Sequence, residues 1–343
     1  MQTHDLSGDD EVLIRMTDVA QRALEQYDVS SESTVSLLNV SENATYRVDD
    51  PTSGERHILR VHRLGYHTRD AIESELAWID ALRNEAGVRT PHIIPTTIGD
   101  RIVTLPDSEG EEPRNVVMFE FLAGHEPPED RLVEDFEELG RLTARMHRHA
   151  RGWSRPAGFT RFAWNYDAAL GQEARWGRWQ DGAGIGAEEL EVLGRLDATL
   201  HRRLAAFGTG PDRYGLVHAD TRLANLLVDE GPSGRTVSVI DFDDSGFSWY
   251  LYDLGTTVSF MEDHPKVPEM VDSWLRGYRQ LLDLPTADEE EIWTFIMFRR
   301  LLLVAWIGSH GAVEIAQELG AGYTVGSCEL AERYLSQFAG MRP

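Results

Sequence analysis

Three oxygen-bearing side chains in the second half of the chain have the types and spacing that phosphoryl transfer needs. Asp220 stands two residues after His218, Asn225 follows five residues later, and Asp241 closes a short apolar run. Transfer of a phosphoryl group from a nucleotide needs a carboxylate that orients the attacking hydroxyl and accepts its proton. It also needs Asn and Asp oxygens for the magnesium ions that neutralise the phosphates. This stretch therefore predicts a phosphotransfer site.

The pattern around these residues predicts a hairpin that brings them together. Its parts are an apolar lead-in at 214–217, strand-like runs at 226–228 and 236–240, and a dense turn signal at 229–234. Such a hairpin carries Asn225 on its way in and Asp241 on its way out, so the two expected metal ligands meet at its open end. The alternative is that Asp220 and Asn225 only cap a turn and that residues 241–244 form a solvated acidic loop.

The motifs at His218–Asn225, Ile240–Asp243 and Tyr252–Leu254 resemble the aminoglycoside phosphotransferase/choline kinase superfamily of small-molecule kinases. The resemblance is greatest to the branch of type II homoserine kinases, hydroxylysine kinase and the bacterial stress-response kinase. It runs from about residue 36 to about residue 335, but only His218–Asp253 is highly specific. It implies an α+β, two-lobed protein-kinase-like fold with ATP in the cleft, a small antiparallel-sheet lobe with one main helix, and a mostly helical second lobe.

The order of the expected elements predicts two domains. Strands around one main helix occupy the first part of the chain after an N-terminal helix, and helices dominate beyond the break at Gly124–Pro128. We expect residues 1–122 to form the nucleotide-binding lobe and residues 123–343 the helical lobe with the catalytic loop and the acceptor site. The expected helices are 8–27, 71–83, 132–148, 188–207, 270–282, 289–307 and 312–337, and the expected strands of the first lobe are 35–40, 45–48, 57–62, 102–105 and 116–121.

A cation on the third expected strand is needed for the α- and β-phosphates, and in kinases it is usually lysine. The chain has one lysine, Lys266, outside the first lobe, so Arg60 takes the position. The resemblance supports this, because related members of the branch use arginine there. A guanidinium can grip two phosphate oxygens, although with a different geometry from lysine. Glu75 on the following helix is the expected ion-pair partner and Glu73 the rival; the alternative for Arg60 is a solvated strand residue.

The other nucleotide contacts are expected from a turn and a hinge strand. Protein kinases cover the phosphates with a glycine-rich loop, whereas residues 39–44 contain no glycine. Ser41, Asn43 and the amides around them are the phosphate-loop candidates, and an Asn-containing turn is common in the small-molecule branch. The backbone from Glu120 to Leu122 is expected to hydrogen-bond adenine. Without the resemblance, these segments are a plain hairpin turn and a buried strand.

The resemblance also assigns roles in the second lobe. Asp220 orients and deprotonates the acceptor hydroxyl, and Asn225 and Asp241 hold magnesium. Asp243 either assists the metal or caps the loop that follows it. Asp253 is expected to accept hydrogen bonds from the catalytic loop and to act as scaffold.

Two residues within the catalytic loop are expected to support this chemistry. His218 is expected to brace the loop rather than carry a proton. Arg222 stands where protein kinases often place a lysine near the γ-phosphate, so it would stabilise transition-state charge, or else it is a surface residue. Ala219 replaces a glycine that is frequent in the superfamily.

The acceptor site is expected between the boundary helix and the catalytic loop, where the superfamily builds its substrate pocket. Trp164, Trp176 and Trp179 are the aromatic candidates, and they suit an amino-acid-like or ring-bearing acceptor. Ordinary packing is the alternative for all three, because tryptophans mostly lie in cores or subunit contacts. Arg299, next to Arg300 on a late helix, is a candidate clamp for an acceptor carboxylate.

Composition limits the range of partners. A formal net charge of −25 argues against nucleic acid, whose phosphates need a basic surface, and it permits a cationic substrate. Acidity also suits simple solubility or a salty habitat. The single cysteine, Cys328, excludes an internal disulfide and a cysteine-built metal site. No run approaches the roughly eighteen apolar residues of a membrane span, and the N-terminus lacks a signal-peptide layout, so we expect a cytoplasmic protein without a membrane partner.

The sequence thus predicts an ATP- and magnesium-dependent phosphotransferase that acts on a hydroxyl of a small molecule. The expected acceptor is an amino alcohol, a hydroxy amino acid or an aminoglycoside-like compound. Two alternatives remain at this point: a protein Ser/Thr kinase of the bacterial stress-response type, and a nucleotide-binding pseudokinase with a regulatory role. A preference for GTP over ATP and the oligomeric state stay open.

Overall fold

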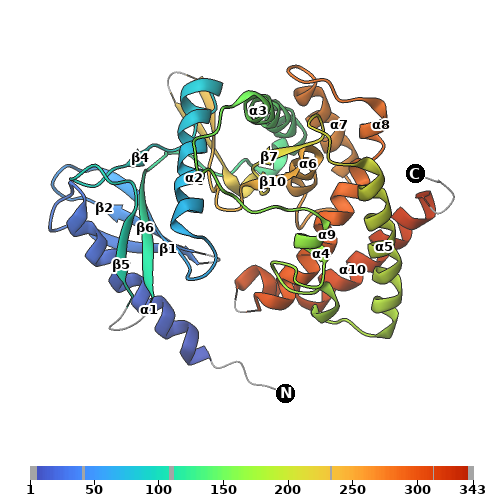
Figure 1. The fold of residues 1–343 in the computed structure, drawn as a ribbon, viewed down its shortest axis with the longest axis horizontal. Helices are drawn as coiled ribbons and strands as arrows, with labels where there is room; N and C mark the ends of the chain where they lie inside the picture. Colours follow the sequence, from blue (N-terminus) through green and yellow to red (C-terminus); the bar gives the residue numbers. More distant parts are fainter. Residues whose placement is uncertain (1–5, 41–42, 108–111, 232–233, 312, 339–343) are drawn as a thin grey trace. The chain divides into compact units, whose positions relative to one another are not determined.

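A computed structural model of the chain describes residues 6–40, 43–107, 112–231, 234–311 and 313–338. The described residues form two compact units (Figure 1). The first falls within Met1–Arg83, Arg89–Gly124 and Arg155–Thr160. The second falls within Asn84–Val88, His125–Ser154 and Arg161–Pro343. Residues 84–88 thus belong to the second unit although they lie within the sequence of the first, and residues 155–160 belong to the first unit although they lie within the sequence of the second.

The first unit is built on an antiparallel sheet with the strand order β1-β2-β3-β6-β4, in which β5 also pairs with β6. Side chains alternate along the central strands, so that in β2 Ala44, Tyr46 and Val48 are buried and the residues between them are not. The strands are β1 (Thr34–Val40), β2 (Ala44–Asp49), β3 (Arg56–Val61), β4 (Ile93–Ile94), β5 (Val103–Pro106) and β6 (Pro113–Glu120).

Helix α1 (Leu6–Ala23) covers one face of this sheet (Figure 1). Its apolar residues recur at helical spacing and join the inward residues of the strands in a single core. Helix α2 (Arg69–Ala81) begins at Thr68, whose hydroxyl accepts a hydrogen bond from the Ala71 amide at 3.2 Å. The shared core residues include Met16, Val19, Ala20 and Ala23 of α1, and Leu59, Val61, Val116 and Met118 of the strands.

The second unit is mostly helical. Helices α3 and α7 approach closely because Gly140 and Gly277 lie at their contact; a Cβ on Gly140 would stand 2.0 Å from the Trp274 carbonyl oxygen. Helices α6 and α9 meet in the same way at Gly255. The helices are α3 (Leu132–Gly152), α4 (Tyr166–Leu170), α5 (Ala187–Phe207), α6 (Tyr250–Thr257), α7 (Val267–Tyr278), α8 (Thr286–Glu289), α9 (Ile292–Ser309) and α10 (Glu314–Phe338).

Helix α9 is apolar over most of its surface, apart from the buried Arg299 and Arg300, as befits a helix surrounded by protein. Within the described part of the chain, Thr286–Ser309 is the one segment long and apolar enough to cross a membrane, and 83% of its apolar window is buried inside the protein. That burial is typical of a core helix. Helix α10 contains a kink at Gly320, where φ is 44°.

Two small strand pairs flank the predicted site. The expected hairpin is present as β8 (Leu226–Gly231) and β9 (Gly234–Val239). The apolar lead-in is β7 (Tyr214–Val217), which pairs antiparallel with β10 (Gly246–Trp249), a strand the sequence did not predict. The α+β architecture, an antiparallel sheet followed by a helical region, is confirmed.

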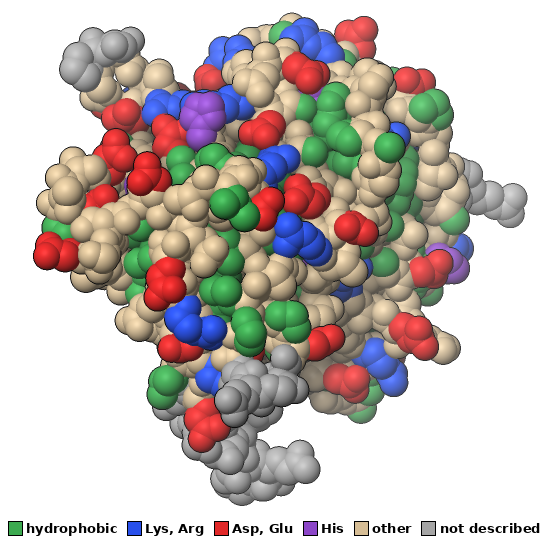
Figure 2. All heavy atoms as spheres, turned by 60° about the vertical axis from the view of Figure 1, so that its left-hand side comes forward, with side chains coloured by type: hydrophobic (Ala, Val, Ile, Leu, Met, Phe, Trp, Pro, Cys, Tyr) green, Lys and Arg blue, Asp and Glu red, His purple; other side chains and the backbone are tan. Residues whose placement is uncertain are grey.

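Charged side chains are dispersed on the surface. On the face that Figure 2 shows, Asp and Glu side chains are interspersed with Arg side chains and with uncharged surface. The net charge of −25 therefore does not gather into one acidic field on this face.

Candidate active site

The predicted catalytic loop connects β7 to β8, and its second residue lies in the left-handed region. Ala219 has a φ of 67°, which costs a non-glycine residue roughly 1–2 kcal/mol. The loop is held in this conformation by Asp253, whose Oδ1 accepts from the Ala219 amide at 2.7 Å and whose Oδ2 accepts from the His218 amide at 3.2 Å. The expected scaffold role of Asp253 is thereby confirmed. Glycine adopts a positive φ without this cost, which is a physical reason for its frequency at this position in the superfamily.

A buried hydrogen-bond chain fixes Asp253 in turn. His147 Nε2 lies 2.9 Å from Asp253 Oδ2, and His147 Nδ1 lies 3.0 Å from the Tyr278 hydroxyl. Burial lowers the pKa of His147 and outweighs the opposing effect of Asp253. The neutral imidazole therefore donates from Nε2 to Asp253 and accepts at Nδ1 from Tyr278.

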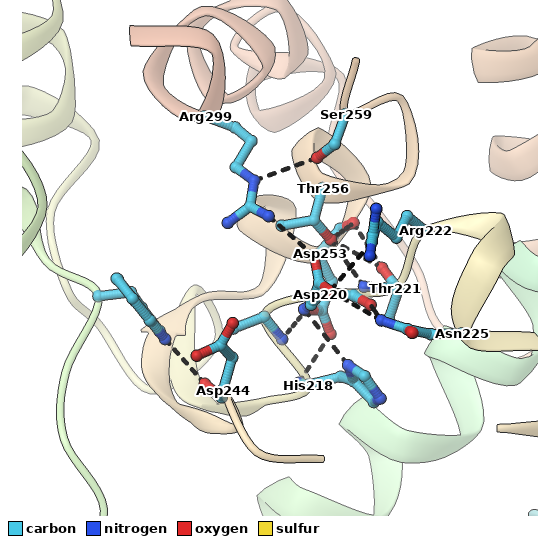
Figure 3. Close-up of polar contacts among 12 residues, drawn as sticks. His218, Asp220, Thr221, Arg222, Asn225, Asp244, Asp253, Thr256, Ser259 and Arg299 are labelled. Atoms are coloured by element: carbon cyan, nitrogen blue, oxygen red, sulfur yellow. Dashed lines mark hydrogen bonds and ion pairs between the residues drawn. The ribbon is translucent and has the colours of Figure 1, made fainter. Parts of the chain in front are cut away.

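The Asp220 carboxylate is held by three donors, shown in Figure 3. Oδ2 accepts from Asn225 Nδ2 at 2.7 Å and from Arg222 Nε at 3.2 Å. Oδ1 accepts from Arg299 Nη2 at 2.8 Å. Burial alone would raise the pKa of Asp220, but the positive charges of Arg222 and Arg299 lower it, and the balance leaves the pKa below its ordinary value. Asp220 is therefore an ionised, oriented carboxylate.

His218 is engaged at both ring nitrogens. Nδ1 accepts from the Asp220 amide at 3.3 Å, so Nε2 carries the proton and donates to the Ile240 carbonyl oxygen at 3.1 Å. The ring also packs on Phe242, with the centroids 4.5 Å apart. These contacts connect the predicted catalytic loop to the segment that follows β9 and contains Asp241, and so hold the two segments together.

Asn225 and Asp241 lie at the open end of the β8–β9 hairpin. Leu226 pairs with Val239, and the Ile240 amide donates to the Asn225 carbonyl oxygen at 3.0 Å. Asp241 follows directly, with a φ of 61° in the left-handed region. The hairpin therefore places the two expected metal ligands side by side along the backbone.

The donor chemistry of this hairpin end fits magnesium. The Asn225 amide nitrogen is turned to Asp220, which leaves the amide oxygen as the atom for a metal, and Asp241 adds a carboxylate. In the part of the chain that the structure describes, no cluster of three or more His, Cys, Asp or Glu side chains forms a metal cage. A metal here would complete its coordination with substrate phosphates and water, as Mg²⁺ commonly does.

The loop after Asp241 is fastened through its carbonyl oxygens. Arg161 donates to the carbonyl oxygens of Ser245, at 2.6 Å, and of Asp243. Trp164 Nε1 donates to the Asp244 carbonyl oxygen at 2.8 Å. The Asp243 side chain is buried. None of the sequence patterns predicted Arg161 as the residue that holds this loop.

Arg60 and Glu75 form a buried ion pair in the first unit. Glu73 lies instead 3.9 Å from Arg101, so the expected choice of Glu75 over Glu73 is confirmed. The guanidinium of Arg60 also lies over the Phe119 ring, 5.1 Å from its centroid. The cation is therefore fixed by its neighbours, which excludes the alternative of a solvated strand arginine.

The other residues expected to contact nucleotide also lie in the first unit. Asn43 is buried, and its Oδ1 accepts from the Arg63 amide at 3.1 Å. Ser41 lies outside the described residues. Glu120 Oε2 accepts from the His92 amide at 3.2 Å, and Leu122 is buried.

The three candidate tryptophans are buried in the second unit. Trp164 donates to the loop after Asp241, as described above, and Trp179 Nε1 donates to Asp197 Oδ2 at 3.1 Å. Trp176 lies against Trp164, with ring centroids 4.8 Å apart, and the Arg299 guanidinium stands 5.3 Å from its centroid. Trp176 thus lies next to Arg299, one of the residues that hold Asp220.

Comparison with known proteins gives the family. A family model for the phosphotransferase enzyme family (APH) matches residues 34–291. The chain belongs to this family. It is a kinase within the aminoglycoside phosphotransferase/choline kinase superfamily, with the expected kinase-like fold, and the pseudokinase alternative is set aside.

Individual relatives extend over nearly the whole chain. A solved structure of a microcompartment-associated aminopropanol kinase is 50% identical, with a TM-score of 0.86, and covers 95% of this chain and 99% of its own. The amicoumacin kinase of Bacillus subtilis (strain 168) is 24% identical over 311 residues, 87% of each chain. The amicoumacin kinase hAmiN, solved with AMP-PNP, Ca²⁺ and Ami, is 22% identical with a TM-score of 0.75 over 96% of both chains. These proteins act on small molecules, and the chain is similarly a phosphotransferase for a small-molecule hydroxyl.

Proposed function

We propose that the protein is an ATP- and magnesium-dependent kinase that phosphorylates the hydroxyl of a small amino alcohol. The observation that carries this proposal is the Asp220 carboxylate, ionised and held by Asn225, Arg222 and Arg299. Similarity over nearly the whole chain to an aminopropanol kinase supports the acceptor class. Such an acceptor is a cation, which suits a chain with a net charge of −25.

In the proposed reaction, Asp220 orients the acceptor hydroxyl and receives its proton as the oxygen attacks. A bond forms between the acceptor oxygen and the γ-phosphorus, and the bond from that phosphorus to the β-phosphate oxygen breaks, releasing ADP. A carboxylate with a lowered pKa is a weak base, so Asp220 contributes mostly by orientation until late in the transfer, when the hydroxyl becomes acidic. Arg222 adds positive charge near the transferred group.

The proposed metal ligands are Asn225 and Asp241, with Asp243 as an assisting carboxylate. Magnesium, when bound there, neutralises charge on the phosphates. His218 contributes by bracing, since its ring joins the catalytic loop to the strand that ends before Asp241. This makes His218 a support for the geometry and not a proton carrier.

The proposed nucleotide residues belong to the first unit, and we assign residues 1–122 this role and residues 123–343 the catalytic and acceptor roles. Arg60, held by Glu75, is the cation for the α- and β-phosphates. Ser41 and Asn43 form the phosphate loop, and the backbone from Glu120 to Leu122 binds adenine. The acceptor site includes Trp176, while the hydrogen bonds of Trp164 and Trp179 indicate scaffold roles. We place the enzyme in the cytoplasm, where ATP is available.

The test measures ADP release with aminopropanol, a hydroxy amino acid, an aminoglycoside and a protein acceptor, with and without magnesium. We expect turnover with the amino alcohol that depends on magnesium. Asp220→Asn should lower kcat by at least about a hundredfold, because it removes the proton acceptor. Asp272→Asn, the same change at an exposed position of α7, is the matched control and should leave activity unchanged. Phosphate incorporated only into protein would instead identify a protein Ser/Thr kinase, and full activity of Asp220→Asn would remove the assigned base.

A further inference from the structure

Arg299 of α9 lies directly against the carboxylate that serves as the proposed base. Its side chain is 3% exposed, and three of its nitrogens are engaged by groups of the chain itself. Nη2 donates to Asp220 Oδ1 at 2.8 Å, Nη1 to the Tyr252 hydroxyl at 3.1 Å, and Nε to Ser259 Oγ at 3.1 Å (Figure 3 shows the first and third of these). A buried guanidinium held at three points has a fixed direction.

The two oxygens of Asp220 are used differently. Oδ2 accepts from both Arg222 Nε and Asn225 Nδ2, which fills the two acceptor directions of a carboxylate oxygen. Among the described residues, the donor on Oδ1 is Arg299 Nη2, which leaves Oδ1 one acceptor direction for a further hydroxyl. The direction of Arg299 therefore decides where an acceptor hydroxyl can meet Asp220.

The loop after α6 supports both guanidinium groups that hold Asp220. Ser259 binds Arg299, and the Arg222 guanidinium stands 5.8 Å from the centroid of the Phe260 ring. Phe260 has a φ of 69°, an outlier for a bulky residue, and such conformations persist only where the surroundings enforce them. This loop is therefore shaped around the positions of Arg222 and Arg299.

We propose that Arg299 is a positioning residue for the reaction, which aims Asp220 Oδ1 at the acceptor hydroxyl and does not itself bind the acceptor. This inference rests on the proposed function, because it takes Asp220 as the base. It replaces the expectation that Arg299 clamps an acceptor carboxylate. The contacts to Asp220, Tyr252 and Ser259 already commit the guanidinium within the protein.

The experiment compares Arg299→Gln, Arg299→Lys and Ser259→Ala in the full chain. Arg203→Lys is the matched control, because Arg203 is also buried and is paired with Glu291 at 2.6 Å, away from the catalytic loop. Each variant is assayed for kcat, for the KM of ATP and for the KM of the acceptor. One series uses an amino alcohol as the acceptor and the other uses a hydroxy amino acid. Melting temperature with and without magnesium and AMP-PNP reports folding and nucleotide binding independently of turnover.

We expect Arg299→Gln to lower kcat about tenfold to a hundredfold, the effect of removing a hydrogen bond to a charged group, with KM changed less than about threefold. The loss should be the same for both acceptors. Arg299→Lys restores one cationic donor and should recover part of kcat. Ser259→Ala should lower kcat only by about threefold, because Ser259 supports the Arg299 guanidinium without touching Asp220. The nucleotide-induced rise in melting temperature should persist in every variant. Arg203→Lys should keep its kcat even where its melting temperature falls.

Three outcomes would contradict the inference alone. A kcat within twofold of wild type in Arg299→Gln, with Asp220→Asn inactive, would overturn the positioning role and leave the proposed function intact. A rise of KM confined to the hydroxy amino acid would make Arg299 a clamp for the acceptor. An equal loss of kcat in Arg203→Lys would show that the loss in the Arg299 variants comes from general destabilisation. Full activity of Asp220→Asn would instead overturn the proposed function, and the inference with it.

Discussion

Replacing His147 by phenylalanine should destabilise the protein more than any exposed histidine replacement. His147 is fully buried, and its ring lies against Tyr250 and Tyr278 with centroids 4.7 and 5.6 Å away, so a phenyl ring keeps most of the packing. It removes the hydrogen bonds to Asp253 and to the Tyr278 hydroxyl. The lost bond costs about 1–3 kcal/mol at each of the two buried partners, so the free energy of unfolding should fall by about 2–6 kcal/mol.

This prediction is tested by equilibrium unfolding in urea. The midpoint should move to a lower urea concentration, while the slope of the unfolding free energy against urea concentration stays constant. His149→Phe is the matched control on the same helix, because His149 pairs with the exposed Glu85 at 3.1 Å. The His149 side chain is only 7% exposed, but Glu85 is 56% exposed and returns to water when the pair is lost, so the pair contributes about 0–1 kcal/mol. Since Asp253 also holds the amides of His218 and Ala219, kcat of His147→Phe should fall together with stability.

The reasoning fails if His147→Phe unfolds within about 1 kcal/mol of wild type, because a loss that small is no more than one ordinary hydrogen bond. It also fails if His149→Phe is equally damaging. In the first case the chain through Asp253 would not be the support of the catalytic loop that its geometry indicates.

Two further predictions concern the same unit. The pKa of His147 is lowered in the folded protein, so the unfolded chain binds more protons below about pH 6.5; stability should be fully present above that pH and decline below it by up to about 1.4 kcal/mol per pH unit. His147→Phe should make this decline shallower, as thermal melts between pH 5 and 8 would show. Gly140→Ala should cost at least about 1–3 kcal/mol, because the added Cβ meets the Trp274 carbonyl oxygen of α7 at 2.0 Å. Gly194→Ala in α5, where a Cβ meets nothing within 4 Å, should instead stabilise by about 0.5–1 kcal/mol, so equal melting temperatures for the two variants would refute the packing argument.

The sequence predicted the elements whose signals are local. Alternation in β2, the apolar spacing of α1 and the pairing of β8 with β9 all depend on residues that are close in the sequence, and these elements lie where they were expected. The pairing of Arg60 with Glu75 was also accessible, because strand order and helix facing restrict the choice to two residues.

Contacts between distant segments carried no such signal. Arg299 stands 79 residues from Asp220, and His147 stands 106 residues from Asp253. Both occur in helices whose sequences do not show which distant residues they contact. Arg299 was predicted as a site residue from its residue type alone. Its contact with Asp220 depends on the packing of α9 against α6, which the sequence does not show. A buried charge demands a partner, but sequence does not say which one.

Ala219 and Asp241 have the same unusual backbone conformation for different purposes. Both are left-handed without being glycine. In a saturation library, glycine should be enriched at 219, where the backbone conformation favours it, and depleted at 241, where the proposed role of Asp241 requires a ligand for a divalent ion. Comparing how well positions 219 and 241 tolerate glycine therefore separates the requirement for a backbone conformation from the requirement for the proposed metal ligand.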